Sequence, residues 1–204
     1  LSIDTAEAES MPGVVRVITA KDIKAAGGTN KINGLVMLPK HNKTDGFERP
    51  VLCDEKIFQF GDAIAIVAAD TEEHARAAEI HPGTPNAFFE TNCIKGPDFD
   101  WDSIPDSQQV EIESYCSRQP HLHLEPDCGY GYIDEDGMIT VHSKSIGIHL
   151  HMPMIADGIG VPLENLRLVQ NHAGGTFGYK FSPTNEALIG AAVKTVSYTH
   201  LTLP

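Results

Sequence analysis

The residues best suited to chemistry gather in a glycine-rich stretch, residues 172–188, which reads HAGGTFGYKFSPTNEAL. Its glycines are Gly174, Gly175 and Gly178. Glycines let a ligand approach the main chain because no Cβ atom stands in the way, and the N–H groups at a helix N-terminus favour anions. The stretch matches neither the dinucleotide G-x-G-x-x-G pattern nor the P-loop. The residues alone therefore indicate either a ligand loop or a tight packing turn.

Two His-Leu-His triplets form a second group of candidate ligands. The first contains His121 and His123, and the second contains His149 and His151. Alternate residues of a strand share a face, so each triplet could present two imidazoles to zinc or copper, with Glu125 as a further ligand of the first pair. Histidines more often make ordinary hydrogen bonds, which leaves the metal site as one of two interpretations.

Other reactive side chains show no pattern that defines a reaction. Lys180 and Glu186 are compatible with an ion pair, a phosphate clamp or plain solvation, and we expect Glu186 to be solvated because carboxylates usually lie at the surface. The four cysteines contain no C-x-x-C pair, so we expect reduced thiols rather than zinc or iron–sulfur ligands. Neither paired carboxylates nor a Ser-His-Asp order stands out.

The bulk composition limits the partners. The chain has 204 residues, 41% hydrophobic and 21% charged, and its 28 acidic residues outnumber 15 basic ones to give a formal net charge of −13. This acidity argues against a nucleic-acid partner, because phosphate backbones are bound by Lys and Arg. The longest apolar run covers residues 63–69, far short of the roughly 20 residues of a membrane helix. We therefore expect an acidic cytoplasmic protein without a membrane span.

The elements that must position these residues are short helices and strands. Residues 1–79 predict a compact mixed unit, whose most apolar strand is followed by a helix capped at Asp70. Residues 80–107 are broken by prolines, glycines and acids and predict a linker. In residues 108–195, Asp136-Gly137 predicts a hairpin turn, and the glycine stretch joins a strand ending near residue 170 to a helix.

Taken together, the motifs resemble the molybdenum-binding large subunit of the xanthine dehydrogenase and aldehyde oxidase family, and most closely bacterial aldehyde oxidoreductases. IDTAEAESMPGVVRVITAKDI and DEKIFQFGDAIAIVAADTEEHARAA are similar to its α/β-hammerhead domain, and RQPHLHLEPD and GGTFGYK are similar to motifs of its molybdopterin-binding domain. The resemblance implies the α+β class, with a truncated α/β-hammerhead domain in residues 1–79 followed by the beginning of a molybdopterin-binding α+β domain in residues 108–195.

The resemblance also implies a site. In this family the glycine loop lies against the molybdopterin cofactor, so the predicted cofactor-binding residues are Gly174, Gly175, Phe177 and Gly178. Neither a direct metal ligand nor a catalytic residue is expected in the chain, because the catalytic glutamate of the family lies beyond this fragment. The implied reaction is oxidation of aldehydes to carboxylic acids, with water as the oxygen source and electrons passed to iron–sulfur and flavin acceptors.

Two positions bear on the substrate. Purine-oxidising members carry a glutamate directly after the lysine of the loop and a glutamine further upstream, whereas this chain has Phe181 and Ile146 at those places. Apolar side chains lower the cost of desolvating an aldehyde and leave the polar edges of a purine unpaired. We therefore expect aldehydes rather than purines as substrates.

Further cofactors and partners follow from the resemblance. The expected cofactor is molybdenum–molybdopterin in the cytosine dinucleotide form. Iron–sulfur clusters and FAD are expected in missing regions or on other subunits, and the full-length form is expected to be a homo-oligomer.

Departures from the family pattern indicate a fragment that is inactive by itself. The chain passes from residue 79 to residue 80 as if the last part of the hammerhead domain were missing. Residues 196–204 match nothing expected in the family, which suggests an artefactual tail, and an iron–sulfur cysteine pattern is lacking. From the residues alone, three other classes stay open: a non-catalytic nucleotide- or phosphate-binding module that uses GGTFG, a histidine-based metalloprotein, and a structural subunit without a ligand.

Overall fold

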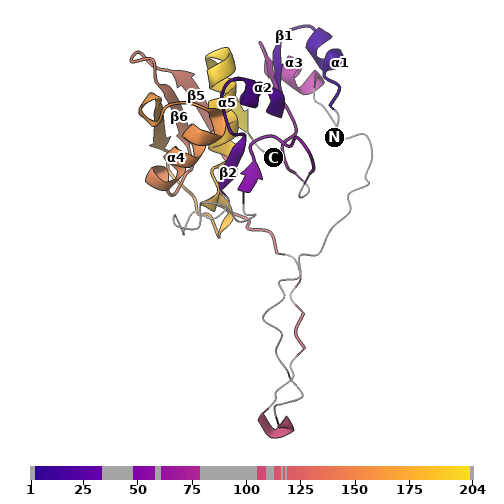
Figure 1. Ribbon diagram of the computed structural model, residues 1–204, viewed down its shortest axis with the longest axis vertical. Coiled ribbons are helices and arrows are strands. Elements are labelled where there is room, and N and C mark those ends of the chain that lie inside the picture. Colours follow the sequence, from indigo (N-terminus) through magenta and orange to yellow (C-terminus); the bar gives the residue numbers. More distant parts are fainter. Residues whose placement is uncertain are drawn as a thin grey trace. The chain divides into compact units, whose positions relative to one another are not determined.

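The computed structural model of the chain describes residues 3–33, 48–57, 61–78, 105–108, 113–115, 117 and 119–202. Contacts divide the chain into two compact units, of which the first joins residues 1–84 to residues 121–204 and the second comprises residues 85–120. The described part of the second unit contains the 3₁₀ helix η2 (Asp106–Gln108). The elements discussed below belong to the first unit (Figure 1).

Short helices and strands alternate along the first unit. Its α-helices are α1 (Ala6–Ser10), α2 (Ala20–Ala25), α3 (Glu72–Ala77), α4 (Ile148–Ile159) and α5 (Thr184–Val196), with the 3₁₀ helices η3 (Leu163–Asn165) and η4 (Tyr179–Phe181). Its strands are β1 (Val14–Ile18), β2 (Lys31–Asn33), β3 (Glu48–Pro50), β4 (Ile66–Ala69), β5 (Cys128–Ile133), β6 (Ile139–Ser143), β7 (Leu166–Gln170) and β8 (Tyr198–Thr202). This mixture confirms the predicted α+β class.

The C-terminal strands form a four-stranded sheet in the order β7-β6-β5-β8. β5 pairs antiparallel with β6 and β8, whereas β6 and β7 run parallel. Parallel neighbours need a crossover connection, which α4 and η3 provide. The N-terminal strands form two small antiparallel pairs, β1 with β4 and β2 with β3. The glycine loop therefore leaves the larger sheet from its edge strand β7.

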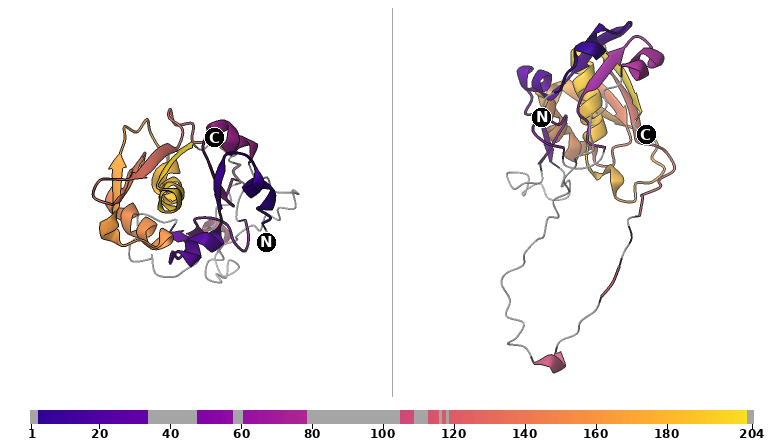
Figure 2. Two further views of the ribbon diagram at one scale, coloured as in Figure 1. Left: turned by 90° about the horizontal axis from the view of Figure 1, so that it is seen from above. Right: turned by 90° about the vertical axis from the view of Figure 1, so that its right-hand side faces the viewer.

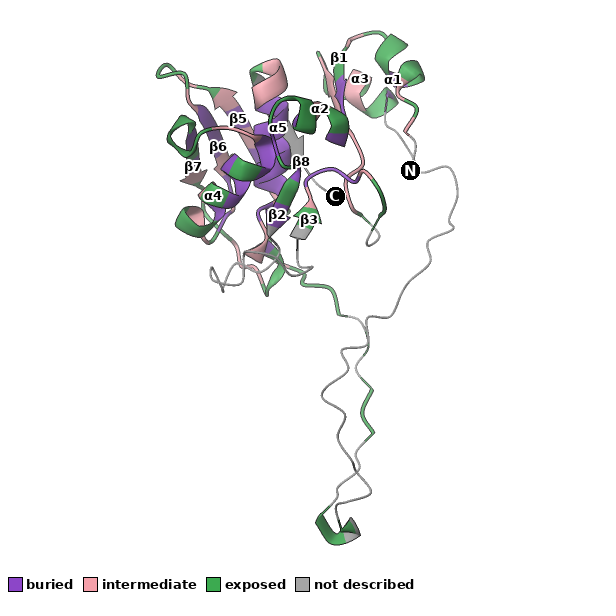
Figure 3. Cartoon of the chain, viewed as in Figure 1, coloured by how far each residue is buried: buried purple, intermediate pink, exposed green. Residues whose placement is uncertain are grey.

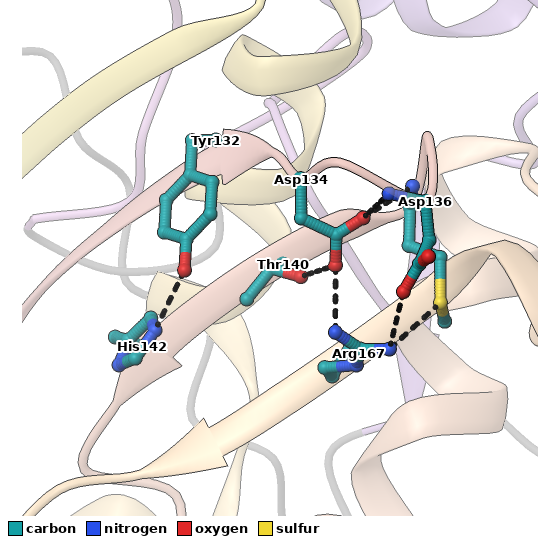
Figure 4. Close-up of polar contacts among 7 residues, drawn as sticks. Tyr132, Asp134, Asp136, Thr140, His142 and Arg167 are labelled. Carbon is teal, nitrogen blue, oxygen red and sulfur yellow. Dashed lines mark hydrogen bonds and ion pairs between the residues drawn. The ribbon is translucent and has the colours of Figure 1, made fainter.

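The turn between β5 and β6 is the hairpin that Asp136-Gly137 predicts, and Gly137 has a φ of +79°. Asp134 organises the turn (Figure 4). Its Oδ1 accepts two backbone N–H groups at 3.0 Å, and its Oδ2 accepts hydrogen bonds from Thr140 and Arg167 at 2.8 Å. These hydrogen bonds, that from Thr140 first, lower the pKa of Asp134. Because Arg167 belongs to β7, they also tie the turn to the edge strand.

Helix α5 packs closely on the four-stranded sheet because two glycines of β5 leave room for it. A Cβ atom at Gly131 would lie 2.8 Å from Ile189 and 2.9 Å from Val193, and one at Gly129 would lie 2.8 Å from Ile189. Every residue from Asn185 to Val193 is buried (Figure 3). The helix also contacts β1 and β4, so it lies between the sheet and the N-terminal elements (Figure 2). A helix covered in this way has little solvent-facing surface for polar side chains.

The main hydrophobic core combines residues of both predicted domains. Ile32 and Leu52 of the N-terminal part lie in one buried cluster with Ile155 of α4 and Ile189 of α5. Burial of apolar surface is the main source of stability, so a shared core predicts that the two parts unfold together.

Polar contacts add to this junction. The N–H group of Asn30 donates to the Gly158 carbonyl at 2.9 Å. Lys194 of α5 donates to the carbonyl oxygens of Ala26, Ile159 and Gly160 at 2.6, 2.8 and 3.0 Å. These carbonyls lie at the ends of α2 and α4, where helices lack internal partners, so Lys194 links three helices.

Some boundaries differ from those predicted. The cap of α3 is Thr71, whose hydroxyl accepts the His74 N–H at 3.2 Å, whereas Asp70 contacts the ring of His74. The predicted tail, residues 196–204, is described up to residue 202 and contains the last residue of α5 and strand β8. The junction between residues 79 and 80 and most of the linker, residues 80–107, lie outside the described residues. The domain boundaries and the artefactual tail therefore stay predictions.

Candidate functional site

The glycine loop lies between β7 and α5, as the sequence predicts, and contains η4. Its backbone takes left-handed conformations, with φ of +102° at Gly175, +45° at Phe177 and +94° at Gly178. Glycine adopts such angles freely, whereas a residue with a Cβ atom does so at a cost of about 1–2 kcal/mol. Among the described residues, no atom would lie within 4 Å of a Cβ at Gly178, and Phe177 is 73% exposed. The loop therefore presents open main chain at Gly178 and the exposed ring of Phe177.

Gly174 differs from the other glycines of the loop. A Cβ atom there would collide with Glu125 Oε2 of the HLEPD segment (residues 123–127), so the present position of the Glu125 carboxylate depends on a glycine at 174. The two main chains also meet, since the Leu124 N–H donates to the Gly174 carbonyl at 3.4 Å. A cofactor contact at Gly174 stays a prediction, because packing already accounts for this glycine.

Lys180 joins the loop to the HLEPD segment. It is 3% exposed, bonds through Nζ to Glu125 Oε1, and donates to the Gly175 carbonyl at 3.1 Å. Of the three interpretations from the sequence, the ion pair is correct for Lys180, but its partner is Glu125 rather than Glu186. A buried and paired ammonium is poorly placed to clamp a phosphate. The hydrogen bond from Lys180 lowers the pKa of Glu125, which stabilises the carboxylate form.

Glu186 is buried, so the expectation of a solvated carboxylate is wrong. It is 4% exposed on α5, because that helix is covered by the sheet on one side and by N-terminal elements on another. Burial raises the pKa of Glu186 to about 7, while a hydrogen bond with Ser143 lowers it. The charge of Asp127 raises it further and that of Lys180 lowers it. The side chain is thus protonated at mildly acidic pH.

A second carboxyl with a raised pKa, the half-buried Asp127, was not identified from the sequence. Burial raises its pKa, and Asn185 Nδ2 donates to its Oδ1 at 3.3 Å. In the described part of the chain, Asn185 Oδ1 and His123 Nδ1 are buried without a hydrogen-bond partner. Since native proteins satisfy nearly all such atoms, they mark a place for a water molecule or a ligand. The sequence feature that could have identified Asp127 was its position in the LEPD motif. Only the fold, however, brings Asp127 close to Asn185.

The second histidine triplet supports the loop through His151. This residue is fully buried, and its ring bonds through Nε2 to the Phe181 carbonyl at 3.1 Å and through Nδ1 to the Ser145 hydroxyl at 2.6 Å. Burial lowers the pKa of His151, so the ring is neutral. Because a carbonyl only accepts, Nε2 carries the proton and Nδ1 accepts from Ser145. These bonds link Phe181 to the segment that carries Ile146, a residue 37% exposed.

The described histidine triplets do not form the metal site that was one of the two interpretations from the sequence. His149 is exposed and His151 is buried, because both lie on α4, where residues two apart point in different directions. The rings of His121 and His123 lie against Tyr179, with centroid distances of 5.4 and 5.2 Å. Within the residues that the structure describes, no group of three His, Cys, Asp or Glu side chains could hold a metal ion.

A hollow of about 640 Å³ adjoins the start of the glycine loop and is lined by Lys144, Gln170, Asn171, His172 and Ala173. Lys144 donates to the His172 carbonyl at 2.8 Å, which joins the end of β6 to the loop. The hollow has a polar wall, the backbone at Gly178 is open, and His123 and Asn185 carry unpartnered buried atoms. These features fit the binding of a large polar group. The arrangement is suited to binding and orienting such a group.

Two family models match adjoining parts of the chain. The "Aldehyde oxidase and xanthine dehydrogenase, a/b hammerhead domain" matches residues 1–80, and the "Molybdopterin cofactor-binding domain" matches residues 80–199. The second match contains the glycine loop and the HLEPD segment. In the part of the chain that the structure describes, no helix is long and apolar enough to cross a bilayer.

Individual relatives agree with these matches. The aldehyde oxidoreductase of Megalodesulfovibrio gigas is 48% identical over 226 residues, which cover 98% of this chain and 24% of the relative. A probable xanthine dehydrogenase component of Bacillus subtilis is 28% identical over 88% of this chain and 26% of its own length. Because the first alignment is longer than the 204 residues of this chain, that relative contains residues without a counterpart here.

Solved structures show the same relationship. The aldehyde oxidoreductase of Desulfovibrio gigas superimposes with a TM-score of 0.74 at 47% identity, over 100% of this chain and 25% of that protein. The enzyme of Desulfovibrio desulfuricans gives a TM-score of 0.75 at 48% identity, over 99% of this chain and 25% of its own. The chain thus spans about a quarter of the length of these relatives. It belongs to the aldehyde oxidase and xanthine dehydrogenase family, and its sequence falls in the hammerhead and molybdopterin cofactor-binding domains of that family.

Proposed function

We propose that the chain is part of a molybdenum hydroxylase that oxidises aldehydes to carboxylic acids, with water as the source of oxygen. The observation that carries this proposal is the open glycine loop after β7, in a segment that matches a molybdopterin cofactor-binding domain. The 48% identity to an aldehyde oxidoreductase supports the choice of aldehydes. The rival classes, a nucleotide-binding module, a histidine metalloprotein or a structural subunit, have no comparable support.

The residues proposed to hold the cofactor are the glycines and the exposed phenylalanine of the loop. Gly175 and Gly178 would allow close approach of the group, and the exposed ring of Phe177 would cover part of it and exclude water. Gly174 would act through its packing against Glu125. When bound, a molybdenum–molybdopterin group supplies a two-electron redox change and activates water. The contribution of this chain is to bind and orient.

The proposed substrate wall combines Phe181 and Ile146. The Phe181 carbonyl is held by its hydrogen bond to His151, whereas the Phe181 ring is a partly exposed apolar surface. An aldehyde carries one polar group and loses little on desolvation at such a wall, whereas a purine would leave several polar edges unpaired. We therefore propose aldehydes over purines.

We also propose, from the resemblance to the family, several features of the whole protein. They are the cytosine dinucleotide form of the pterin, iron–sulfur clusters and FAD as electron acceptors in other regions or subunits, a homo-oligomeric full-length form and a cytoplasmic location. We also propose that the catalytic glutamate lies outside this chain, and that residues 1–79 and 108–195 are its two domains.

The test uses the full-length polypeptide that carries this sequence, isolated with its native cofactor. Metal analysis should find molybdenum, and turnover of benzaldehyde should exceed that of xanthine. The variant Phe181→Glu should lower kcat/KM for benzaldehyde by at least about tenfold, since a carboxylate is costly to desolvate beside an apolar substrate. Zinc or copper in place of molybdenum would favour the histidine metalloprotein, and equal turnover of xanthine and benzaldehyde would exclude the substrate preference.

A further inference from the structure

Lys180 is buried although it directly follows the exposed part of the glycine loop. Gly178 is open to its surroundings, and two positions later Lys180 is only 3% exposed. Burying an ammonium is costly unless it is paired and hydrogen-bonded. The burial of Lys180 therefore depends on the bonds that its ammonium makes.

These bonds join two segments that are distant in the sequence, the glycine loop and the HLEPD segment. Nζ of Lys180 bonds to the Glu125 carboxylate in the HLEPD segment and donates to the Gly175 carbonyl inside the loop at 3.1 Å. The Leu124 N–H reaches the Gly174 carbonyl beside them. The Gly174 carbonyl is thus bound directly by the HLEPD segment, and the Gly175 carbonyl is bound by the lysine that pairs with Glu125 of that segment.

The conformation of the loop needs such support. Phe177 has a φ of +45°, which strains a residue that carries a Cβ atom, and its side chain is 73% exposed. Strained backbone persists only where surrounding contacts hold it. Within the loop, Tyr179 N–H donates to the Thr176 carbonyl at 2.8 Å, and Gly178 N–H reaches the Thr176 hydroxyl at 3.3 Å, but these contacts are local. Lys180 and Glu125 connect the loop to a segment more than fifty positions earlier.

We propose that Lys180 and Glu125 are positioning residues that hold the glycine loop in its open shape. They act through the main chain at Gly174 and Gly175 rather than by touching the ligand of the loop. The identity of that ligand rests on the proposed function, whereas the bracing itself does not.

The experiment compares variants of the full-length polypeptide by amide hydrogen exchange and by molybdenum content. The variant Lys180→Met keeps the aliphatic stem but leaves Glu125 and the Gly175 carbonyl without the ammonium. We expect the amides of Leu124 and Tyr179 to exchange at least about tenfold faster, and the molybdenum content per chain to fall by a similar factor. Glu125→Gln should change both readouts in the same direction, and Lys180→Arg should restore much of the wild-type behaviour, since a guanidinium can pair with the same carboxylate.

A matched control is Lys194→Met, which removes another lysine that donates to main-chain carbonyls of the same unit. It should speed exchange near the ends of α2 and α4 but leave the loop amides and the molybdenum content unchanged. Unchanged exchange of Leu124 and Tyr179 in both Lys180→Met and Glu125→Gln would overturn the bracing role. If the loop amides exchange faster in the variants but the wild-type polypeptide contains no molybdenum, the bracing role is supported and only the proposed function is overturned.

Discussion

Among the described residues, Glu186 is a titratable group whose pKa lies well above its ordinary value. Its unfolded-state pKa is near 4.5, and burial raises the folded-state pKa to about 7. The folded chain therefore holds a proton that the unfolded chain has lost between these pH values. The sign follows from linkage: the free energy of unfolding falls as the pH rises from about 4.5 to about 7, by up to about 3 kcal/mol.

We predict that Glu186→Gln removes this part of the pH dependence. The amide keeps the shape of the protonated carboxyl and has no charge to desolvate, so the variant should be more stable than the wild type at pH 8 and similar at pH 4.5. Urea unfolding across this range measures the difference. Burial also raises the pKa of Asp127, and its charge acts on Glu186, so the difference between the two proteins reports Glu186 together with its coupling to Asp127. Parallel curves for the two proteins would show that Glu186 does not titrate in this window.

Ser145 offers a second test at the scale of single residues. Its hydroxyl is the donor to the buried His151 ring at 2.6 Å, and Ser145 is 2% exposed. Ser145→Ala leaves a buried ring nitrogen without a partner and should lower the free energy of unfolding by about 1–3 kcal/mol. Ser10→Ala is the control, because Ser10 also donates a hydrogen bond, to the Glu7 carbonyl at 2.7 Å, but at an exposed site. Its effect should stay within about 0.5 kcal/mol, and equal effects of the two changes would contradict the account.

At the scale of elements, the end of α4 depends on a glycine. Gly160 takes a φ of +72° as the C-cap, and a Cβ there would collide with the backbone of Gly27 and Gly28. Gly137 in the β5–β6 turn has a similar φ of +79° but open space around it. Both substitutions to alanine carry the same left-handed strain, so the difference between them reports the collision alone.

We predict that Gly137→Ala costs about 1–2 kcal/mol and that Gly160→Ala costs several kcal/mol, because main chain cannot move aside as a flexible side chain can. Denaturant unfolding of the two variants gives the comparison. Hydrogen exchange in α2 should also rise in Gly160→Ala, since that helix ends against Gly160. Equal costs for the two substitutions would mean that residues 27 and 28 move without loss.

At the scale of the molecule, the N-terminal and C-terminal parts of the first unit share one core. Ile32 is 1% exposed and lies against Gly158 of α4, so Ile32→Ala opens a cavity at their junction. We predict a loss of about 2–5 kcal/mol, with faster exchange in both β1 and α5. Val15→Ala serves as the control, because Val15 is 64% exposed in β1 and its truncation should change little. Faster exchange confined to the N-terminal elements would show that the two parts unfold separately.

The sequence by itself determined the features that depend on local chemistry. The apolar run before Asp70 predicts β4, the run that ends near residue 170 predicts β7, Asp136-Gly137 predicts the hairpin, and the glycines predict a loop before a helix. These succeed because turn geometry and backbone preference act over a few residues. The resemblance to the family also depended on short ordered motifs, and the family models confirm it.

Only the tertiary structure decided which side chains are buried and which partners they have. Glu186 reads as a surface carboxylate, and it is buried because elements far away in the sequence cover α5 on more than one side. Lys180 pairs with Glu125, and Asn185 with Asp127, across separations that no local pattern encodes. His149 is exposed and His151 is buried, because their triplet lies on a helix rather than a strand. Burial and ion pairing are properties of the assembled chain, because they arise from distant segments excluding water together.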